Sequence, residues 1–512
     1  MNKQTIGNIL QNVSREKSEQ NMIYDFIHDK AITYGEFQNL TNKVSKGLIS
    51  KGIKKGEHVG ILVDNSINWV TAFYAICNIG AVAVLLNIEL SSEEFLYAIN
   101  FAEVKYLFIT EMLYERISKA GQKTLPQICL LNSDVREQKY LQQLIEEGTM
   151  TSDKLLEERM KNLEENDVAA LQFTSGTTGL PKAVEITHRN ICFNAQSIKS
   201  DLNYTEKDII LLGAPLYHIL GYIATMMTAV MAGASICLIK KFRTIIALQA
   251  IQELKCTSFH GVPIMYQYMV NKYKQFDISS LKKGFVAGAI CSDSLINRIF
   301  KEFKLQQLLD TYGQTESIII ASKNLHLEDY QKQTGFCVKP WVTYRLVDSE
   351  GNEIEIANQE GYLMIKTISL MEGYYKNEQA TQNSMSDDWF LTGDIVQINE
   401  DGTLQICGRN SDYINRGGEN ISAYEIERKI LEYPNVKDAV AIGVPDELYG
   451  QEVAVFVQYA KDAVYKEEEL YQYMQERFAK IEIPKYLKKV DEIPYNAGGK
   501  VQKYKLLESL KK

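Results

Sequence analysis

The sequence predicts an α/β fold followed by a smaller α+β region, and three patterns along the chain support this. In the first part, short apolar runs at 59–63, 81–86 and 106–110 alternate with helical segments at 69–80 and 92–101. This alternation is typical of parallel sheets that are covered by helices on both faces. Residues 341–406 change to short alternating segments with turn signals, which predict antiparallel hairpins. Residues 409–512 mix helical with extended segments.

The remaining elements follow from local signals along the chain. Residues 133–166 are rich in Glu, Lys and Gln, which indicates a surface excursion before an extended segment at 168–173. A second extended segment at 183–187 precedes a helix near His188, with Thr187 as its candidate cap. In the last part, helices are expected at 423–432 and 466–478, and strands at 436–444 and 452–458. The tail, 498–512, is basic and is expected to be exposed.

Composition excludes several classes of protein. With 512 residues the chain can form more than one domain, and its net charge of -9 argues against nucleic acid as a partner. Eight cysteines without a CxxC pair indicate neither a zinc site nor a disulfide framework, and the N-terminal residues lack the apolar core of a signal peptide. A cytoplasmic protein with buried, reduced thiols is expected. The charge-free stretch 209–239 raises a membrane span as an alternative, but Gly and Pro interruptions favour buried strands around a core helix.

The stretch LQFTSGTTGLPK at 171–182 has the composition of an anion-binding loop. Its glycines allow backbone amides to approach a ligand closely, and its hydroxyls and lysine suit phosphate oxygens. A plain polar turn between two strands is the alternative. A P-loop is excluded, since Leu180 and Pro181 separate the last glycine from the lysine and a strand follows. The candidate phosphate-binding residues are Thr174, Ser175, Gly176, Thr177, Thr178, Gly179 and Lys182.

This stretch resembles the signature of the adenylate-forming superfamily, which includes AMP-dependent acyl-CoA synthetases. Further blocks occur in the family's order: TYGQTE at 311–316, LTGD at 391–394, GRNSDYINRGGENISAYEIE at 408–427 and NAGGK at 496–500. The resemblance implies a large N-terminal domain, residues 1–408, of two stacked and mostly parallel sheets with helices and a small β-barrel. It also implies a small mobile C-terminal α+β domain, residues 409–512, that carries a catalytic lysine.

The resemblance implies an ATP- and Mg²⁺-dependent ligase that activates a carboxylic acid as an acyl-AMP. Glu316 is then the expected Mg²⁺ ligand, although a lone Glu after a turn would otherwise be a solvated carboxylate. Thr315 would donate to the α-phosphate. Tyr312 offers an aromatic face to the adenine, and the other residues implied in the nucleotide site are Gly288, Ala289, Asp310, Thr311 and Gly313.

Further residues are implied on both sides of the predicted domain boundary. Asp394 would accept both ribose hydroxyls, and Arg409 would add a cation near the ribose and phosphate. Lys500 would bridge the carboxylate and the α-phosphate during adenylation. After a rotation about a hinge at Ser411, where many relatives carry Asp or Lys, a glycine loop would meet the thiol. The residues implied at that thiol surface are Gly417, Gly418 and Tyr449.

The sequence constrains the acid substrate and the thiol acceptor less than it constrains the nucleotide site. Amino-acid-activating relatives carry an Asp in the pocket block, whereas this chain has YHILG at 217–221, so a fatty or aromatic acid is favoured over an α-amino acid. His218 resembles a residue that gates the acyl tunnel near the carboxylate. Coenzyme A is the expected acceptor; transfer to an acyl carrier protein is the alternative, and a nucleotide-binding module without catalysis is disfavoured. A monomer or a homodimer is expected, without a membrane span.

Overall fold

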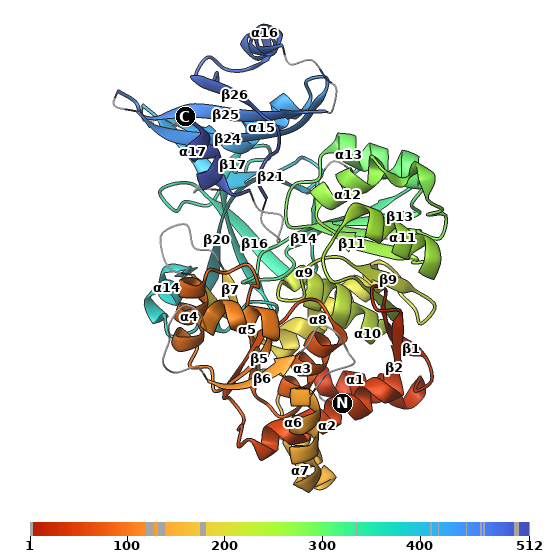
Figure 1. The fold of residues 1–512 in the computed structure, drawn as a ribbon. Helices are drawn as coiled ribbons and strands as arrows, with labels where there is room; N and C mark the ends of the chain where they lie inside the picture. Colours follow the sequence, from red (N-terminus) through yellow and green to blue (C-terminus); the bar gives the residue numbers. More distant parts are fainter. Residues whose placement is uncertain are drawn as a thin grey trace. The chain divides into compact units, whose positions relative to one another are not determined.

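The computed structural model describes residues 4–118, 126–131, 139–174, 181–333, 335–409, 412–417, 419–446, 448–460, 463, 466–495 and 501–510. The chain forms two compact units (Figure 1). The first comprises Met1–Gln333 and Thr367–Asn383, and the second comprises Thr334–Lys366 and Ser384–Lys512. The predicted boundary between residues 408 and 409 lies inside the second unit, and it stays a prediction.

The first unit contains a seven-stranded sheet with the order β18-β8-β7-β4-β3-β5-β6. Its central strands pair in parallel, while β8 and β18 extend one edge in antiparallel fashion. Because the central strands are buried on both faces, they read as nearly continuous apolar runs. The strands are β3 (His58–Leu62), β4 (Val82–Leu85), β5 (Tyr106–Thr110), β6 (Gln127–Leu131), β7 (Val168–Thr174), β8 (Lys182–Thr187) and β18 (Gly373–Tyr374).

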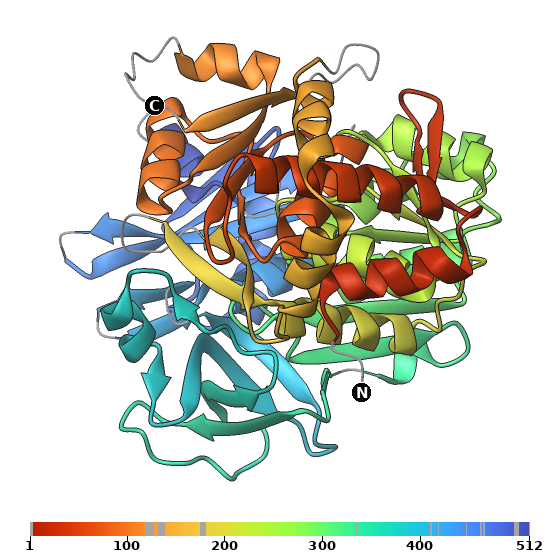
Figure 2. The ribbon, with the colours of Figure 1, turned by 90° about the horizontal axis from the view of Figure 1, so that it is seen from below.

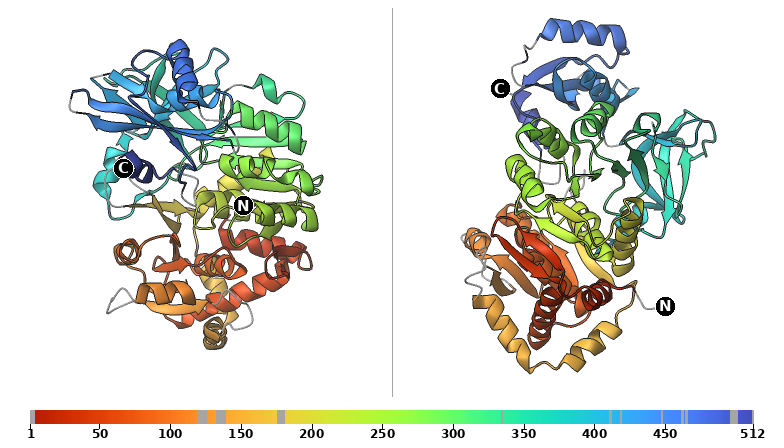
Figure 3. Two further views of the ribbon diagram at one scale, coloured as in Figure 1. Left: turned by 45° about the horizontal axis from the view of Figure 1, so that its top comes forward. Right: turned by 90° about the vertical axis from the view of Figure 1, so that its right-hand side faces the viewer.

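A second sheet of the first unit has the order β14-β13-β12-β11-β9-β10-β1-β2. Among these strands, the pairs β14 with β13 and β2 with β1 are antiparallel, and the pairs between them are parallel. From β9 to β13, coloured yellow to green, strands alternate with helices (Figure 3). The strands are β1 (Asn21–Asp25), β2 (Lys30–Thr33), β9 (Ile209–Leu212), β10 (Ser235–Leu238), β11 (Ser258–Gly261), β12 (Lys283–Ala287), β13 (Gln307–Tyr312) and β14 (Ala321–His326).

Helices of the first unit pack on and between these sheets. The red helices α1 and α2 contact each other (Figure 2). α8 contacts β8 of one sheet and, on its other side, the helix that follows β9 of the other sheet. The helices are α1 (Ile6–Glu16), α2 (Tyr34–Ser50), α3 (Ile67–Asn78), α4 (Ser92–Phe101), α5 (Glu111–Ser118), α6 (Lys139–Glu147), α7 (Asp153–Lys161), α8 (His188–Asp201), α11 (Thr244–Leu254), α12 (Pro263–Val270), α13 (Asp293–Arg298) and α14 (Glu378–Asn383).

Local sequence signals explain the helix starts in this unit. Thr187 caps α8 in a full capping box with Asn190, as the sequence predicts for this cap. The helix after β9 is continuous through α9 (Ile219–Gly221), a π-helical segment η2 (Tyr222–Met227) and α10 (Thr228–Ala232). The predicted buried strands and core helix across 209–239 are therefore confirmed. Among the described residues, no helix is long and apolar enough to cross a membrane.

One expectation for this unit is wrong. The segment 133–166 is not merely a polar surface excursion, because within its described part α6 and α7 pack against α2. Leu141, Leu144, Leu156 and Met160 are buried there at helical spacing. A few apolar residues are enough to bury a helix when they all lie on one of its faces. The composition of the segment does not show this face, because charged residues are far more numerous.

The second unit contains two five-stranded sheets. The first has the order β16-β17-β20-β19 with β21 paired to β20, and the pairs β17–β20, β19–β20 and β20–β21 are antiparallel, as the sequence predicts for this stretch. However, residues 367–383, within the same predicted stretch, belong to the first unit. The strands of this sheet are β16 (Val342–Val347), β17 (Glu360–Thr367), β19 (Met385–Ser386), β20 (Trp389–Ile398) and β21 (Leu404–Arg409). A further short strand, β15 (Cys337–Val338), does not belong to it.

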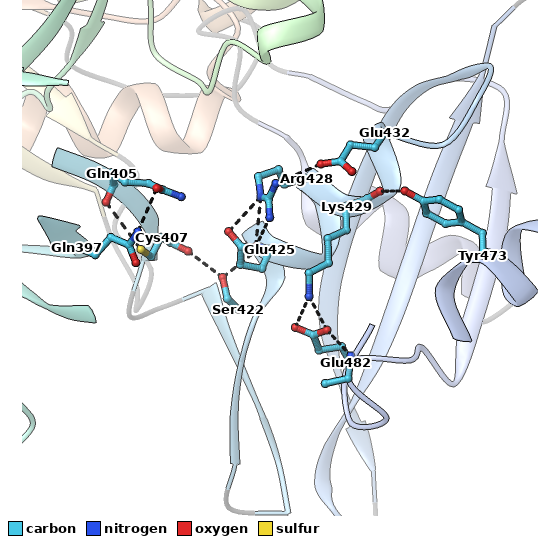
Figure 4. Close-up of polar contacts among 11 residues, drawn as sticks. Gln397, Gln405, Cys407, Ser422, Glu425, Arg428, Lys429, Glu432, Tyr473 and Glu482 are labelled. Carbon is cyan, nitrogen blue, oxygen red and sulfur yellow. Dashed lines mark hydrogen bonds and ion pairs between the residues drawn. The ribbon is translucent and has the colours of Figure 1, made fainter. Parts of the chain in front are cut away.

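The other sheet of the second unit has the order β23-β22-β25-β24, with β26 parallel to β25. Its elements are β22 (Tyr413–Arg416), β23 (Glu419–Ser422), α15 (Ala423–Leu431), β24 (Val436–Asp446), β25 (Gly450–Tyr459), α16 (Glu467–Arg477), β26 (Tyr486–Val490) and α17 (Lys503–Leu510). The four predicted helices and strands match α15, α16, β24 and β25. Figure 4 shows the start of α15, where the Ser422 hydroxyl donates to the Cys407 carbonyl at 2.8 Å and accepts from the Glu425 amide at 3.2 Å.

Two further expectations need correction. The tail 498–512 is not simply exposed, because α17 buries Leu506 against apolar residues of β24 and β25. Cys337 is exposed, while the other seven cysteines are buried. The expectation that the thiols are buried is therefore wrong for Cys337.

Candidate active site

The proposed phosphate loop connects two antiparallel strands, as the sequence predicts. β7 ends at Thr174 and β8 begins at Lys182, and these two residues face each other across the ladder. The Thr174 hydroxyl donates to the Lys182 carbonyl oxygen at 3.5 Å. The loop residues Ser175, Gly176, Thr177, Thr178 and Gly179 lie outside the described residues.

Lys182, Tyr374 and Glu316 form a connected group in the first unit. The Lys182 amino group lies over the Tyr374 ring, 4.6 Å from its centroid. The Tyr374 hydroxyl donates to Glu316 Oε1 at 2.9 Å, and the Met371 amide donates to the Glu316 carbonyl oxygen at 2.7 Å. β18 carries Tyr374 to this position by pairing with β8. A cation and a carboxylate are thus held on either side of one tyrosine.

The loop after β13 folds back sharply on itself and carries Glu316. A Cβ atom on Gly313 would lie 1.9 Å from the Ile318 carbonyl oxygen, so only glycine fits at this position. The Ile320 amide donates to the Tyr312 carbonyl oxygen at 3.0 Å and closes the loop. Gln172, near the end of β7, donates to the Thr315 hydroxyl at 3.5 Å. The carboxyl ends of β7 and β13 therefore meet at this loop.

Several polar groups around this loop are buried without a partner among the described residues: Gln172 Oε1, Asp310 Oδ2, Thr311 Oγ1, Gln314 Nε2 and Ser317 Oγ. A buried polar atom without a hydrogen bond is costly, so a cluster of them indicates that another molecule completes their bonding. The place fits such a molecule, since ligands of α/β proteins bind beyond the carboxyl ends of strands.

The predicted purine residues follow β12 and line β13. Gly288, with φ +87°, and Ala289 are exposed directly after β12, while Asp310 and Tyr312 are buried on β13. Burial raises the pKa of Asp310 to about 7, and the charge of Lys323 on the neighbouring strand opposes that rise. Because β12 and β13 are adjacent and parallel, the ends of both strands lie at one edge of the sheet.

His218 caps the helix that begins at residue 219. Its Nδ1 accepts a hydrogen bond from the Leu220 amide at 3.4 Å, and its side chain is half-buried. The preceding loop is fixed by Asn65, whose side chain donates to the Ala214 carbonyl at 2.9 Å and accepts from the Leu216 amide at 2.8 Å. His218 is therefore held at the N-terminus of a buried helix.

His188 and His260 lie in the core, where structural roles are expected. His260 is fully buried and bonds the Tyr204 hydroxyl at 2.8 Å, while His188 Nδ1 accepts from the Ile6 amide at 3.4 Å. Burial lowers the pKa of His260 to about 3 and that of His188 to about 4. Both rings are therefore neutral at physiological pH.

In the second unit, Asp394 and Arg409 form an ion pair. They are directly opposite each other on β20 and β21, with Arg409 Nε 2.8 Å from Asp394 Oδ1. The Asp394 side chain is 3% exposed, whereas that of Arg409 is 44% exposed. The arginine thus neutralises a buried carboxylate and still presents part of its guanidinium to solvent.

Gly417 and Tyr449 also lie together in the second unit. The Gly417 amide donates to the Tyr449 carbonyl at 2.8 Å, and Gly417 has a φ of +63°. A Cβ atom there would approach the Tyr449 ring to 3.1 Å, which is closer than most side chains pack. The predicted residues Gly418, Ser411 and Lys500 lie outside the described residues.

Two residues of this arrangement, Tyr374 and Gln172, are not predicted from the sequence. Tyr374 is 58 positions from Glu316, and Gln172 is 143 positions from Thr315. Tyr374 lies in the run MEGYYK, where nothing in the spacing distinguishes one tyrosine from the next. Only the pairing of β18 with β8 shows which tyrosine faces the carboxylate.

Comparisons with known proteins identify the family of the chain. Residues 10–375 match the family model described as AMP-binding enzyme, and residues 425–500 match the AMP-binding enzyme C-terminal domain. The chain is 32% identical to the acyl-CoA ligase sidI of Aspergillus fumigatus, covering 93% of this chain and 85% of that protein. It is 28% identical to the mitochondrial medium-chain acyl-CoA ligase ACSF2 of Mus musculus, covering 99% and 87%.

The fold also matches a solved structure closely. ATP-bound MatB from Rhodopseudomonas palustris superposes with a TM-score of 0.86 over 99% of both chains, at 24% identity. The family models span most of the chain and include the motif blocks up to residue 375 and from residue 425. The chain therefore belongs to the family of AMP-binding enzymes, the adenylate-forming enzymes that its motifs resemble.

Proposed function

We propose that this protein is an ATP-dependent acid-thiol ligase that forms an acyl-AMP and transfers the acyl group to coenzyme A. The carboxylate oxygen attacks the α-phosphorus of ATP and pyrophosphate leaves, after which the thiol sulfur attacks the acyl carbon and AMP leaves. The observation that carries this proposal is the group of buried polar atoms without a partner among the described residues, at the end of β7 and around the loop that carries Glu316. They suit a polar anionic ligand held between a cation and a carboxylate.

The nucleotide would be held by residues at the carboxyl ends of β7, β12 and β13. Thr174 and Lys182, with the loop between them, would bind the β- and γ-phosphates, and Thr315 would donate to the α-phosphate. The adenine would lie against Tyr312 near Gly288, Ala289, Asp310, Thr311 and Gly313. Asp394 would accept the ribose hydroxyls, and Arg409, already paired with it, would hold that carboxylate in place.

Mg²⁺ would be held by Glu316, where it would neutralise phosphate charge. No group of three or more His, Cys, Asp or Glu side chains among the described residues could hold a metal ion. A single carboxylate fits Mg²⁺, which usually takes one or two protein carboxylates and otherwise binds phosphates and water. Tyr374 bonds Oε1 of Glu316, so Oε2 would be the oxygen that binds the cation.

The acid would be a fatty or aromatic carboxylic acid. His218 lies where an amino-acid-activating enzyme would place an acidic partner for the substrate ammonium, and a buried ammonium without such a partner is disfavoured. The two relatives named above are described as acyl-CoA ligases, one of them medium-chain. His218 would lie near the substrate carboxylate at the start of the buried helix.

The second half-reaction would use Gly417, Gly418 and Tyr449 to receive the thiol, and Lys500 would act only in adenylation. A cytoplasmic location is part of this proposal, as is a monomeric or homodimeric state. These assignments rest on the motif resemblance together with the contact between Gly417 and Tyr449.

A screen of carboxylic acids tests the proposed function. Each acid would be mixed with ATP and Mg²⁺, and pyrophosphate release would be followed with hydroxylamine to trap the adenylate, with and without CoA. We expect fatty or aromatic acids to give hydroxamate without CoA and a thioester with CoA. Adenylate formation with no CoA thioester, but with acyl transfer to a phosphopantetheinylated carrier protein, would show that the acceptor is the carrier protein and not CoA. Nucleotide binding without pyrophosphate release from any acid would contradict the proposal.

A further inference from the structure

Arg416 connects the two turns that form the proposed thiol surface. It ends β22 directly before Gly417 and pairs across the sheet with Gly450, directly after Tyr449. Its side chain is largely buried, at 20% exposure. A buried guanidinium needs partners for all its donors, so its contacts show what it holds in place.

The hydrogen-bond partners of Arg416 come from two separate parts of the domain. Nε and Nη2 donate to the two oxygens of Glu452 at 2.9 and 3.0 Å, which is a bidentate pair with a carboxylate that is itself 3% exposed. Nη1 donates to the Ile481 carbonyl at 2.7 Å and to the Ile483 carbonyl at 3.4 Å. The guanidinium thus ties β22 to β25 and to the segment before β26.

The same guanidinium lies over the Tyr449 ring, with Cζ 5.5 Å from its centroid, within the range of a cation–π contact. Tyr449 is 43% exposed and Leu448 is 79% exposed, so this turn presents apolar surface to solvent beside Gly417. Asp446 closes the turn from its other end by accepting from the Leu448 and Tyr449 amides at 2.9 and 3.0 Å.

We propose that Arg416 is a positioning residue for the thiol half-reaction, because it fixes Gly417 and Tyr449 relative to each other as one surface for the pantetheine arm. This inference rests on the proposed function. Pantetheine combines amide groups with an apolar dimethyl centre, and the surface offers a glycine backbone beside an exposed aromatic and a leucine. Arg416 would not touch the reacting atoms. Its effect is on how the surface is held and therefore on the binding of CoA.

The test compares the two half-reactions in Arg416→Lys. Lysine keeps the positive charge but loses the planar fork that bonds Glu452, Ile481 and the Tyr449 face together. We expect acyl-AMP formation within twofold of wild type, and the KM for CoA in thioester formation from supplied acyl-AMP to rise by about tenfold or more, since small misplacements of binding groups have effects of this size.

Arg428→Lys is the matched control. Arg428 lies on α15 in the same domain and also pairs with carboxylates, Glu425 at 2.9 Å and Glu432 at 3.2 Å, but its side chain is 44% exposed (Figure 4). We expect it to leave both half-reactions unchanged. If thermal melting shows that Arg416→Lys does not fold, the same two assays are made on Glu452→Gln. This variant keeps the shape of the residue that pairs with Arg416 and removes its charge.

Each outcome separates this inference from the proposed function. A folded variant with a KM for CoA within twofold of wild type, or with equal losses in both half-reactions, overturns the positioning role alone. A wild-type protein that forms acyl-AMP but no CoA thioester overturns the CoA acceptor of the proposed function and this inference with it. A selective rise in the KM for CoA, absent in Arg428→Lys, supports the assignment.

Discussion

Replacing Tyr374 by Phe should weaken activity through Glu316. The change removes the hydroxyl that donates to Glu316 Oε1 at 2.9 Å but keeps the ring that faces the Lys182 amino group. A hydrogen bond to a charged group contributes about 1.5–3 kcal/mol, and we take the lower value because Glu316 is only half-buried. At about 1.4 kcal/mol per tenfold change, adenylation should fall by about tenfold.

The assay for Tyr374→Phe is pyrophosphate release at varied Mg²⁺ concentration, with Tyr375→Phe as the matched control. The Tyr375 hydroxyl donates instead to Glu103, at 3.3 Å, on a different part of the surface. We expect a higher Mg²⁺ requirement for Tyr374→Phe and unchanged kinetics for Tyr375→Phe. Wild-type kinetics in Tyr374→Phe, or the same loss in both variants, would refute the role of this tyrosine in holding the carboxylate.

Four further outcomes are expected. Lys500→Ala should lower acyl-AMP formation by about 10²–10³, as measured by pyrophosphate exchange, while conversion of supplied acyl-AMP and CoA to thioester continues; equal loss in both assays would contradict its assignment. Because His218 replaces an acidic pocket residue, exchange should occur with fatty or aromatic acids, and robust exchange with α-amino acids alone would reverse the pocket assignment. Ser411→Pro fixes φ and removes an amide, so single-turnover acyl-AMP should persist while steady-state thioester production falls, unless melting shows a general loss of stability; unchanged steady-state ligation would place the hinge elsewhere. Burial lowers the pKa of His188 from 6.5 to about 4, so between these pH values the unfolded chain binds a proton that the folded chain does not. The free energy of unfolding should therefore fall by up to about 1.4 kcal/mol for each pH unit as the pH drops from 6.5 to about 4. Urea unfolding of His188→Gln should show a flatter pH dependence than wild type.

The sequence predicts the elements of the fold because their signals are local. The apolar periodicity of β3 to β5 and the capping residue Thr187 act within a few positions, so they can be found without tertiary contacts. The adenylate-forming family could also be identified from ordered motif blocks, and the matching family models confirm it. Local signals fail where a helix has one narrow apolar face, as at α6, α7 and Leu506.

The candidate site is only partly predictable for the same reason. Its glycine and hydroxyl positions follow from the motifs, but their roles stay predictions. The contacts of Tyr374 with Glu316 and of Arg416 with Glu452 join residues 58 and 36 positions apart. Strand pairing in three dimensions determines which side chains meet, and no spacing rule in the sequence contains that information.

The central claim is that the acid is activated at the α-phosphate of ATP, and oxygen transfer tests it most directly. An acid labelled with ¹⁸O in its carboxylate would be turned over with ATP and CoA, and the products would be analysed by mass spectrometry. Because the carboxylate oxygen that attacks the α-phosphorus stays on the nucleotide when the thiol displaces it, we expect one ¹⁸O atom in AMP. Label in inorganic phosphate with ADP as the product, or thioester formation with unlabelled AMP, would contradict activation through an acyl adenylate.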